Sequence, residues 1–225
     1  LIISGEGDIP DYDHNNTPAK ADTSAVESDD YRNSIFYTRL SQTPLTGYFR
    51  DDVINIALSQ LGYHEGDAET DYDGSNENGT GNYTEYGYYM ESSGSAWCSE
   101  FASWCIRMAS VPESIIKSSN SANAYDFTEG TTSTPYNWQK LIYGGGKYTP
   151  RKGDILLWAW DLDEHGVDDY VSHTTILIDV KTNGNEVTFY TIVGNQNGAV
   201  TEKEYTVDIS NGKLINRTGR LCYLI

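Results

Sequence analysis

The chain has 225 residues, 38% of them hydrophobic and 12% aromatic, so it is long enough for one globular domain with its own core. Its 33 acidic and 15 basic residues give a formal net charge of −18, which argues against nucleic acid or an anionic membrane surface as a partner. No apolar run approaches the roughly 20 residues of a membrane span. The three cysteines are too few for a disulfide scaffold.

Residues 1–46 form a polar N-terminal stretch that carries Pro, Ser, Thr and acidic residues without hydrophobic periodicity. This composition predicts an acidic linker or a partly docked tail. The short apolar patch from Ile35 to Leu40 is the part that we expect to dock. Residues 47–225 are then the expected globular domain.

The first regular element is predicted from Arg50 to Leu61, followed by Gly62 as a C-terminal stop signal. Its apolar residues share one helix face, at three- and four-residue spacing: Val53, Ile54, Ala57, Leu58 and Leu61. We therefore expect an amphipathic helix that packs on the core.

A polar loop from Tyr63 to Asn82 follows this helix. In it Glu69, Asp71 and Asp73 alternate and precede a glycine, as oxygen ligands do at the start of a calcium loop. Thr80 stands where a bidentate glutamate would close such a site. A solvated acidic loop is thus the better interpretation, with calcium near Asp71 and Asp73 as the alternative.

The stretch from Gly94 to Ser110 predicts a second amphipathic helix, with Ser95 as its expected N-cap. Cys98 then falls in the first helical turn, where unpaired backbone N–H groups and the helix dipole favour a thiolate. That position suits a nucleophile. The alternative is that Cys98 is a small buried apolar residue at a helix start.

After weak signals from Val111 to Thr149, the apolar pattern changes to that of strands. Five strands are predicted, at Asp154 to Trp160, Val171 to Val180, Glu186 to Ile192, Val200 to Val207 and Gly219 to Ile225. Asn183-Gly184 between the second and third is an Asn-Gly hairpin signal. Helices followed by antiparallel strands indicate an α+β fold.

A cysteine nucleophile needs a base, and the base needs an orienting group. His173 opens a predicted strand, whereas His165 lies in a polar acidic loop, so His173 is the better candidate. A hairpin centred on residues 183 and 184 would place His173 opposite residue 194, to within a residue or two. Asn195 is the polar side chain in that window, and its amide oxygen can accept a hydrogen bond from the imidazole.

Five short motifs in this order resemble those of CHAP domains, the cysteine- and histidine-dependent amidohydrolases and peptidases. They span about Gly47 to Ile225: Ser59-Gln60-Leu61-Gly62-Tyr63, Trp97-Cys98-Ser99-Glu100-Phe101, Gly153-Asp154-Ile155, Ser172-His173 and Gly194-Asn195. The resemblance implies that Cys98 is the nucleophile and His173 the general base, with Asn195 as the matched third residue. The family usually has Glu-Gly-Asn where this chain has Val193-Gly194-Asn195.

The resemblance further implies a papain-like fold and a bacterial, secreted or cell-surface peptidoglycan hydrolase that cleaves an amide bond in a stem peptide or cross-bridge. We expect no cofactor and a monomer. Tyr86, Tyr88, Tyr89 and Trp97 would either line a substrate groove or pack in the core. The alternatives are a catalytically weak module that binds cell-wall fragments and an amidase acting on a non-wall peptide conjugate.

Overall fold

A computed structural model describes residues 20–111, 150–159, 173–208, 210, 213–215, 217 and 219–224. In these residues, helices precede a single antiparallel sheet, which confirms the predicted α+β fold. The helical elements are η1 (Thr23–Ala25), α1 (Asp29–Arg32), α2 (Ile35–Gln42), α3 (Phe49–Ser59), α4 (Glu85–Tyr89) and α5 (Cys98–Met108). None of the described helices is long and apolar enough to cross a membrane.

The sheet has five strands in the order β4-β3-β2-β1-β5, and every neighbouring pair is antiparallel. The strands are β1 (Ile155–Ala159), β2 (His173–Asn183), β3 (Glu186–Gln196), β4 (Ala199–Asp208) and β5 (Arg220–Leu224). All five lie where the hydrophobic pattern predicts them. The stretch between 112 and 149, for which the sequence signals are weak, lies outside the described residues. So does His165 with the polar loop around it.

The hairpin between β2 and β3 turns at Gly184 and Asn185, one residue later than predicted. Gly184 has a φ of +60°, which suits glycine at the first central position of a type II′ turn. Asn183 therefore pairs with Glu186 as the last residue of its strand. A bulge between Leu177 and Asp179 then shifts the register again, so that Ile176 pairs with Ile192.

The sheet is strongly curved, and each of its faces carries a separate hydrophobic cluster. Trp158 on β1 and Tyr205 on β4 are separated by two strands, yet their ring centroids are 4.6 Å apart. Contact between such distant strands requires the sheet to curl around its Trp158 face. The opposite face, with Leu157 and Ile176, packs in the same cluster as the helices.

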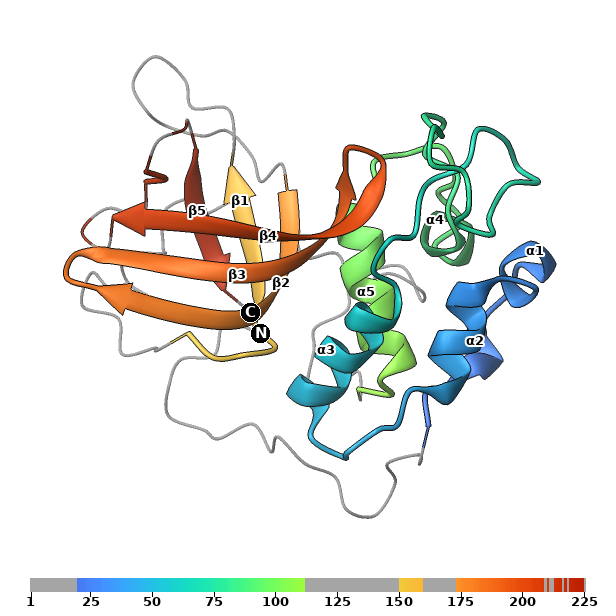
Figure 1. Ribbon diagram of the computed structural model, residues 1–225, viewed down its shortest axis with the longest axis horizontal. Helices are drawn as coiled ribbons and strands as arrows, with labels where there is room; N and C mark the ends of the chain where they lie inside the picture. The colour runs from blue at the N-terminus through green and yellow to red at the C-terminus, as the bar shows by residue number, and fades with distance from the viewer. Residues whose placement is uncertain are drawn as a thin grey trace.

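Helix α5 is the central helix, because it contacts β2 and β3 on one side and α3 and α4 on the other (Figure 1). Helix α3 confirms the helix predicted from Arg50 to Leu61, and Gly62 follows it with a left-handed φ of +84°. Between α5 and the outer helices lies a buried aromatic group in which Tyr86 contacts its neighbours at centroid distances of 4.9–5.5 Å: Tyr63, Trp97, Phe101 and Trp104.

The N-terminal helices contribute to this same core. Tyr31 of α1 and Phe36 and Leu40 of α2 are buried in the cluster that contains α3 and α5. The Tyr31 hydroxyl donates a hydrogen bond of 2.9 Å to the buried Gln60 Oε1. Within the patch expected to dock, Phe36 and Leu40 are buried, whereas Ile35 at its start is exposed.

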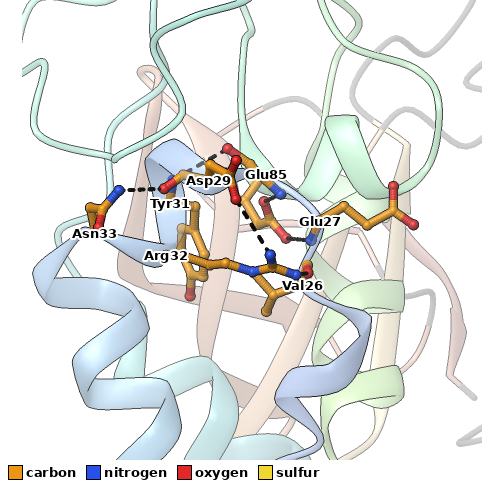
Figure 2. Close-up of polar contacts among 8 residues, drawn as sticks. Val26, Glu27, Asp29, Tyr31, Arg32, Asn33 and Glu85 are labelled. Atoms are coloured by element: carbon orange, nitrogen blue, oxygen red, sulfur yellow. Dashed lines mark hydrogen bonds and ion pairs between the residues drawn. The ribbon is translucent and has the colours of Figure 1, made fainter.

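A buried carboxylate joins this N-terminal segment to the rest of the molecule (Figure 2). The backbone N–H groups of Glu27 and Ser28 donate hydrogen bonds to the two carboxylate oxygens of Glu85, both at 3.3 Å. Glu85 is the first residue of α4 and is fully buried. Arg32 closes the loop by donating to the carbonyl oxygen of Val26. The segment is therefore held by polar contacts as well as by apolar packing.

Candidate active site

Cys98 is the first residue of α5, so it lies in the first helical turn as predicted. The cap position belongs to Trp97, whose side chain makes no capping hydrogen bond, and the prediction of Ser95 as the N-cap is wrong. The Ser95 N–H instead donates to the Ser92 carbonyl oxygen at 3.2 Å in a turn that includes Gly94 with a φ of +85°. The helix therefore begins two residues later than an N-cap at Ser95 would start it.

The start of α5 is fixed by Trp97 and by a close approach of β3. Trp97 is fully buried, and its indole Nε1 donates a hydrogen bond of 2.7 Å to Glu65 Oε2. At Gly194 on β3, an added Cβ would lie 2.7 Å from Phe101 Cβ and 2.9 Å from Trp97 Cζ3. Gly194 is thus needed because a larger residue would push β3 and α5 apart.

His173 is the first residue of β2, is 7% exposed and pairs with Trp158 across the β1–β2 ladder. The backbone N–H of the next residue, Thr174, lies close enough to the Cys98 thiol to lower its pKa. The structure therefore brings the predicted nucleophile to the backbone immediately beside the predicted base.

Burial dominates the electrostatics of both groups. It raises the pKa of the Cys98 thiol, although the N–H groups of Thr174, Ser99 and Cys98 itself oppose this effect. Burial, assisted by the positive charge of Arg217, lowers the pKa of His173 to about 4. The expectation that the helix start favours a thiolate is therefore wrong for the free protein, because desolvation outweighs the N–H groups. Near pH 7 the Cys98 thiol and the His173 imidazole are therefore both neutral.

Asn195 lies near the end of β3 with a left-handed φ of 57°. Its side-chain amide donates a hydrogen bond of 3.5 Å to Asn82 Oδ1. The β2–β3 ladder is paired as far as Ile176 and Ile192, and the same register continued three residues further would set position 173 opposite 195. Val193, two residues earlier, stands where the family pattern usually has a glutamate, and it is fully buried.

Two further residues, Tyr205 and Arg217, lie near this pair, since Arg217 acts electrostatically on His173 and Cys98 acts on Tyr205. No motif in the sequence points to either residue. The Tyr205 ring packs on Trp158, and the Arg217 guanidinium carbon is 5.8 Å from the Tyr205 ring centroid. Burial raises the pKa of Tyr205 to about 12, with the charge of Arg217 opposing this shift and that of Cys98 adding to it. Only the curvature of the sheet brings β4 to this position, so no local sequence pattern could have revealed it.

The Gly153-Asp154 motif has a structural role at the start of β1. Asp154 is fully buried, accepts the Arg151 N–H at 2.8 Å and pairs with the Arg50 guanidinium. A Cβ at Gly153 would lie 2.6 Å from Arg50 Cβ. These contacts fix the start of β1 against α3.

The aromatic residues considered for a substrate groove are mostly core residues. Tyr86 and Trp97 are fully buried and Tyr89 is 9% exposed, whereas Tyr88 is 40% exposed. Tyr88 stacks on Tyr72 at a centroid distance of 5.0 Å. Of the four, Tyr88 alone therefore offers a substantial surface to solvent.

The acidic loop is organised by its own hydrogen bonds. Asp71 Oδ2 accepts from the Asp67 N–H at 3.0 Å and from the Asn76 amide at 2.9 Å, and Asp73 Oδ1 accepts from the Ser75 N–H at 2.8 Å. Within the described part of the chain, no group of three or more His, Cys, Asp and Glu side chains is arranged to hold a metal ion. Calcium near Asp71 and Asp73 stays a prediction.

Comparison with known proteins gives one match. Residues 90–195 match the family model of the CHAP domain, which confirms the resemblance drawn from the sequence motifs. The matched segment, just under half of the chain, contains Cys98 and His173 and ends at Asn195. Neither a curated protein nor a solved structure matches the chain significantly.

Proposed function

We propose that this protein is a cysteine-dependent amidohydrolase or peptidase that cleaves an amide bond in peptidoglycan peptides. The observation that carries the proposal is that Cys98 starts α5 and His173 starts β2, the strand against which α5 packs, with the Thr174 N–H close enough to lower the pKa of the thiol. The CHAP match over residues 90–195 supports an amidase or peptidase of the cell-wall type. A bacterial, secreted or cell-surface enzyme that acts as a monomer is part of the same proposal.

The pKa shifts favour a general-base mechanism over a preformed thiolate–imidazolium pair. As the Cys98 sulfur attacks the carbonyl carbon, its proton passes to the neutral imidazole of His173. The Cys98 backbone N–H, in the first turn of α5, would stabilise the oxyanion. His173 then protonates the leaving amine and the C–N bond breaks, which leaves a thioester. Water, deprotonated by His173, hydrolyses the thioester and frees the thiol.

Asn195 is the proposed orienting residue. An amide oxygen near the imidazole would accept its N–H and fix the tautomer whose other nitrogen takes the thiol proton. The continued β2–β3 register and the hydrogen bond that ties Asn195 to Asn82 support this role. The role predicts that Asn195→Ala lowers kcat more than it changes KM.

The buried Val193 favours one alternative, a module that binds cell-wall fragments with little turnover. At this position the family usually has a glutamate, and a valine side chain can accept no hydrogen bond. Such a module would retain peptidoglycan and release no products.

The test is incubation of the purified protein with peptidoglycan, followed by mass spectrometry of new amine termini. We expect products from the wild type and from Cys105→Ala, which removes a buried thiol on the same helix, and none from Cys98→Ala. Equal products from wild type and Cys98→Ala would overturn the proposal. Retention of peptidoglycan without new termini would favour the binding module. A parallel assay with simple alanyl and γ-glutamyl amides would identify a non-wall amidase.

A further inference from the structure

Arg217 is held over the sheet by the segment that follows β4. Leu214 forms an isolated bridge with Val207, and the Ile215 N–H donates a hydrogen bond of 2.8 Å to the Thr206 carbonyl oxygen. The chain thereby doubles back beside β4 and sets the Arg217 guanidinium over the Tyr205 ring. Arg217 is exposed, whereas Tyr205 is 3% exposed. A cation in contact with water therefore rests on a buried aromatic ring.

Successive contacts lead from this cation to His173, the proposed base. Tyr205 packs on Trp158 with ring centroids 4.6 Å apart, and Trp158 pairs with His173 across the β1–β2 ladder. The electrostatics agree with this placement, because the charge of Arg217 lowers the pKa of both His173 and Tyr205. The charge of a Cys98 thiolate also acts on Tyr205.

Arg217 is a positive charge near the proposed active site of a protein that is strongly negative overall. The chain has a formal net charge of −18, so its overall field repels anions. A guanidinium binds a carboxylate through two parallel hydrogen bonds, and stacking on an aromatic ring preorganises it for this contact. We propose that Arg217 recognises a carboxylate group of the peptide substrate close to the amide that Cys98 attacks. The inference rests on the proposed function of Cys98 and His173.

The test uses Cys98 as a reporter and needs no knowledge of the peptide. Iodoacetate and iodoacetamide both alkylate a thiol: sulfur bonds to the CH₂ carbon, iodide leaves and the thiol proton is released. They differ in that iodoacetate carries a carboxylate. The rate at Cys98 is measured for each reagent by peptide mass spectrometry, in the wild type, Arg217→Gln, Arg217→Lys and Arg107→Gln. Arg107 is the matched control, because it is an exposed arginine in the last turn of α5, far from Cys98.

We expect the iodoacetate-to-iodoacetamide rate ratio at Cys98 in the wild type to exceed that of free glutathione. Arg217→Gln should lower the ratio about threefold to tenfold, which is the size of one partly screened charge contact. Arg217→Lys should retain part of the preference, and Arg107→Gln should keep the full wild-type ratio.

Two other outcomes are distinguishable. If Cys98 reacts readily with both reagents and Arg217→Gln leaves the ratio unchanged, the inference is overturned while the proposed function stands. If Cys98 reacts no faster than the buried Cys105 with either reagent, the proposed function fails and the inference fails with it. With a cleavable peptide in hand, amidation of its carboxylate should raise KM in the wild type and change little in Arg217→Gln.

Discussion

The indole nitrogen of Trp97 donates a 2.7 Å hydrogen bond to Glu65 Oε2, and both side chains are buried. Trp97 immediately precedes Cys98, so this bond fixes the residue from which α5 starts. The Glu65 N–H in turn donates to the Gly198 carbonyl oxygen at 2.8 Å, which connects the loop to the turn between β3 and β4. Glu65 is therefore a positioning residue for the proposed nucleophile.

Glu65→Ala should lower the free energy of unfolding by about 2 kcal/mol, because it leaves a buried indole N–H without its acceptor. Glu65→Gln keeps an amide oxygen at that place and should cost less than half as much. Urea unfolding measures both changes. Glu77→Ala, an exposed glutamate in the same loop, is the control and should change stability by less than about 0.5 kcal/mol. Equal losses for Glu65→Ala and Glu77→Ala would refute the positioning role.

Gly194→Ala should destabilise the protein by about 1–3 kcal/mol, since the added methyl group would overlap Phe101 and Trp97. The relief of this overlap moves α5 away from β3, so iodoacetamide should also react with Cys98 at a changed rate. Glu202→Ala is the control, because Glu202 is an exposed residue on the neighbouring strand β4. A Gly194→Ala variant as stable as Glu202→Ala would show that the packing at α5 is loose.

The lowered pKa of His173 predicts a loss of stability in acid. Between pH 6.5 and about 4 the unfolded chain binds a proton at this histidine and the folded chain does not, so stability falls as the pH falls through this window. The loss from pH 7 to pH 5 should be about 1–2 kcal/mol smaller in His173→Gln than in the wild type. Urea unfolding at the two pH values measures it. Parallel pH profiles for the two proteins would mean that His173 is not desolvated.

Glu85 predicts the opposite dependence. Burial raises the pKa of this carboxyl to about 8, so between pH 4.5 and 8 the folded chain holds a proton that the unfolded chain has released. Stability therefore falls as the pH rises through this window. From pH 5.5 to 8 the loss should be about 2 kcal/mol smaller in Glu85→Gln than in the wild type. Glu204→Gln, which changes an exposed carboxylate on β4, should lose as much stability over this pH range as the wild type. The prediction fails if Glu85→Gln also loses as much as the wild type.

The spacing of apolar residues in the sequence predicted those elements that bury a single face or consist of an unbroken apolar run. Helix α3 and strand β1 are examples, because α3 buries one face and β1 carries an uninterrupted apolar run. The hairpin turn was placed one residue early because Asn183-Gly184 and Gly184-Asn185 are both acceptable turn pairs. The bulge at residues 177–179 left no signal in the sequence, although it shifts the pairing of β2 with β3 by one residue.

The proposed nucleophile and base could be found from the sequence because each opens a regular element with a recognisable pattern. The direction of the pKa shifts of Cys98 and His173 could not be predicted from the sequence, because it depends on how deeply other segments bury the two side chains. Glu65 and Glu85 likewise look like ordinary polar loop residues in the sequence, and only tertiary structure shows that both are buried acceptors. No sequence pattern indicates a role for Arg217, because the ring that it contacts, Tyr205, lies on a separate strand, β4.

The burial of Tyr31, Phe36 and Leu40 has a practical consequence for protein engineering. These side chains share a core cluster with Trp104 of α5, and burial of each contributes about 1.5–3 kcal/mol, so the three together are comparable to the whole net stability of a typical domain. A recombinant chain that begins at Gly47 would lose them and would expose Tyr63 and Trp104 to water. Anyone who transplants this unit into a chimaeric enzyme should therefore start the graft no later than Lys20.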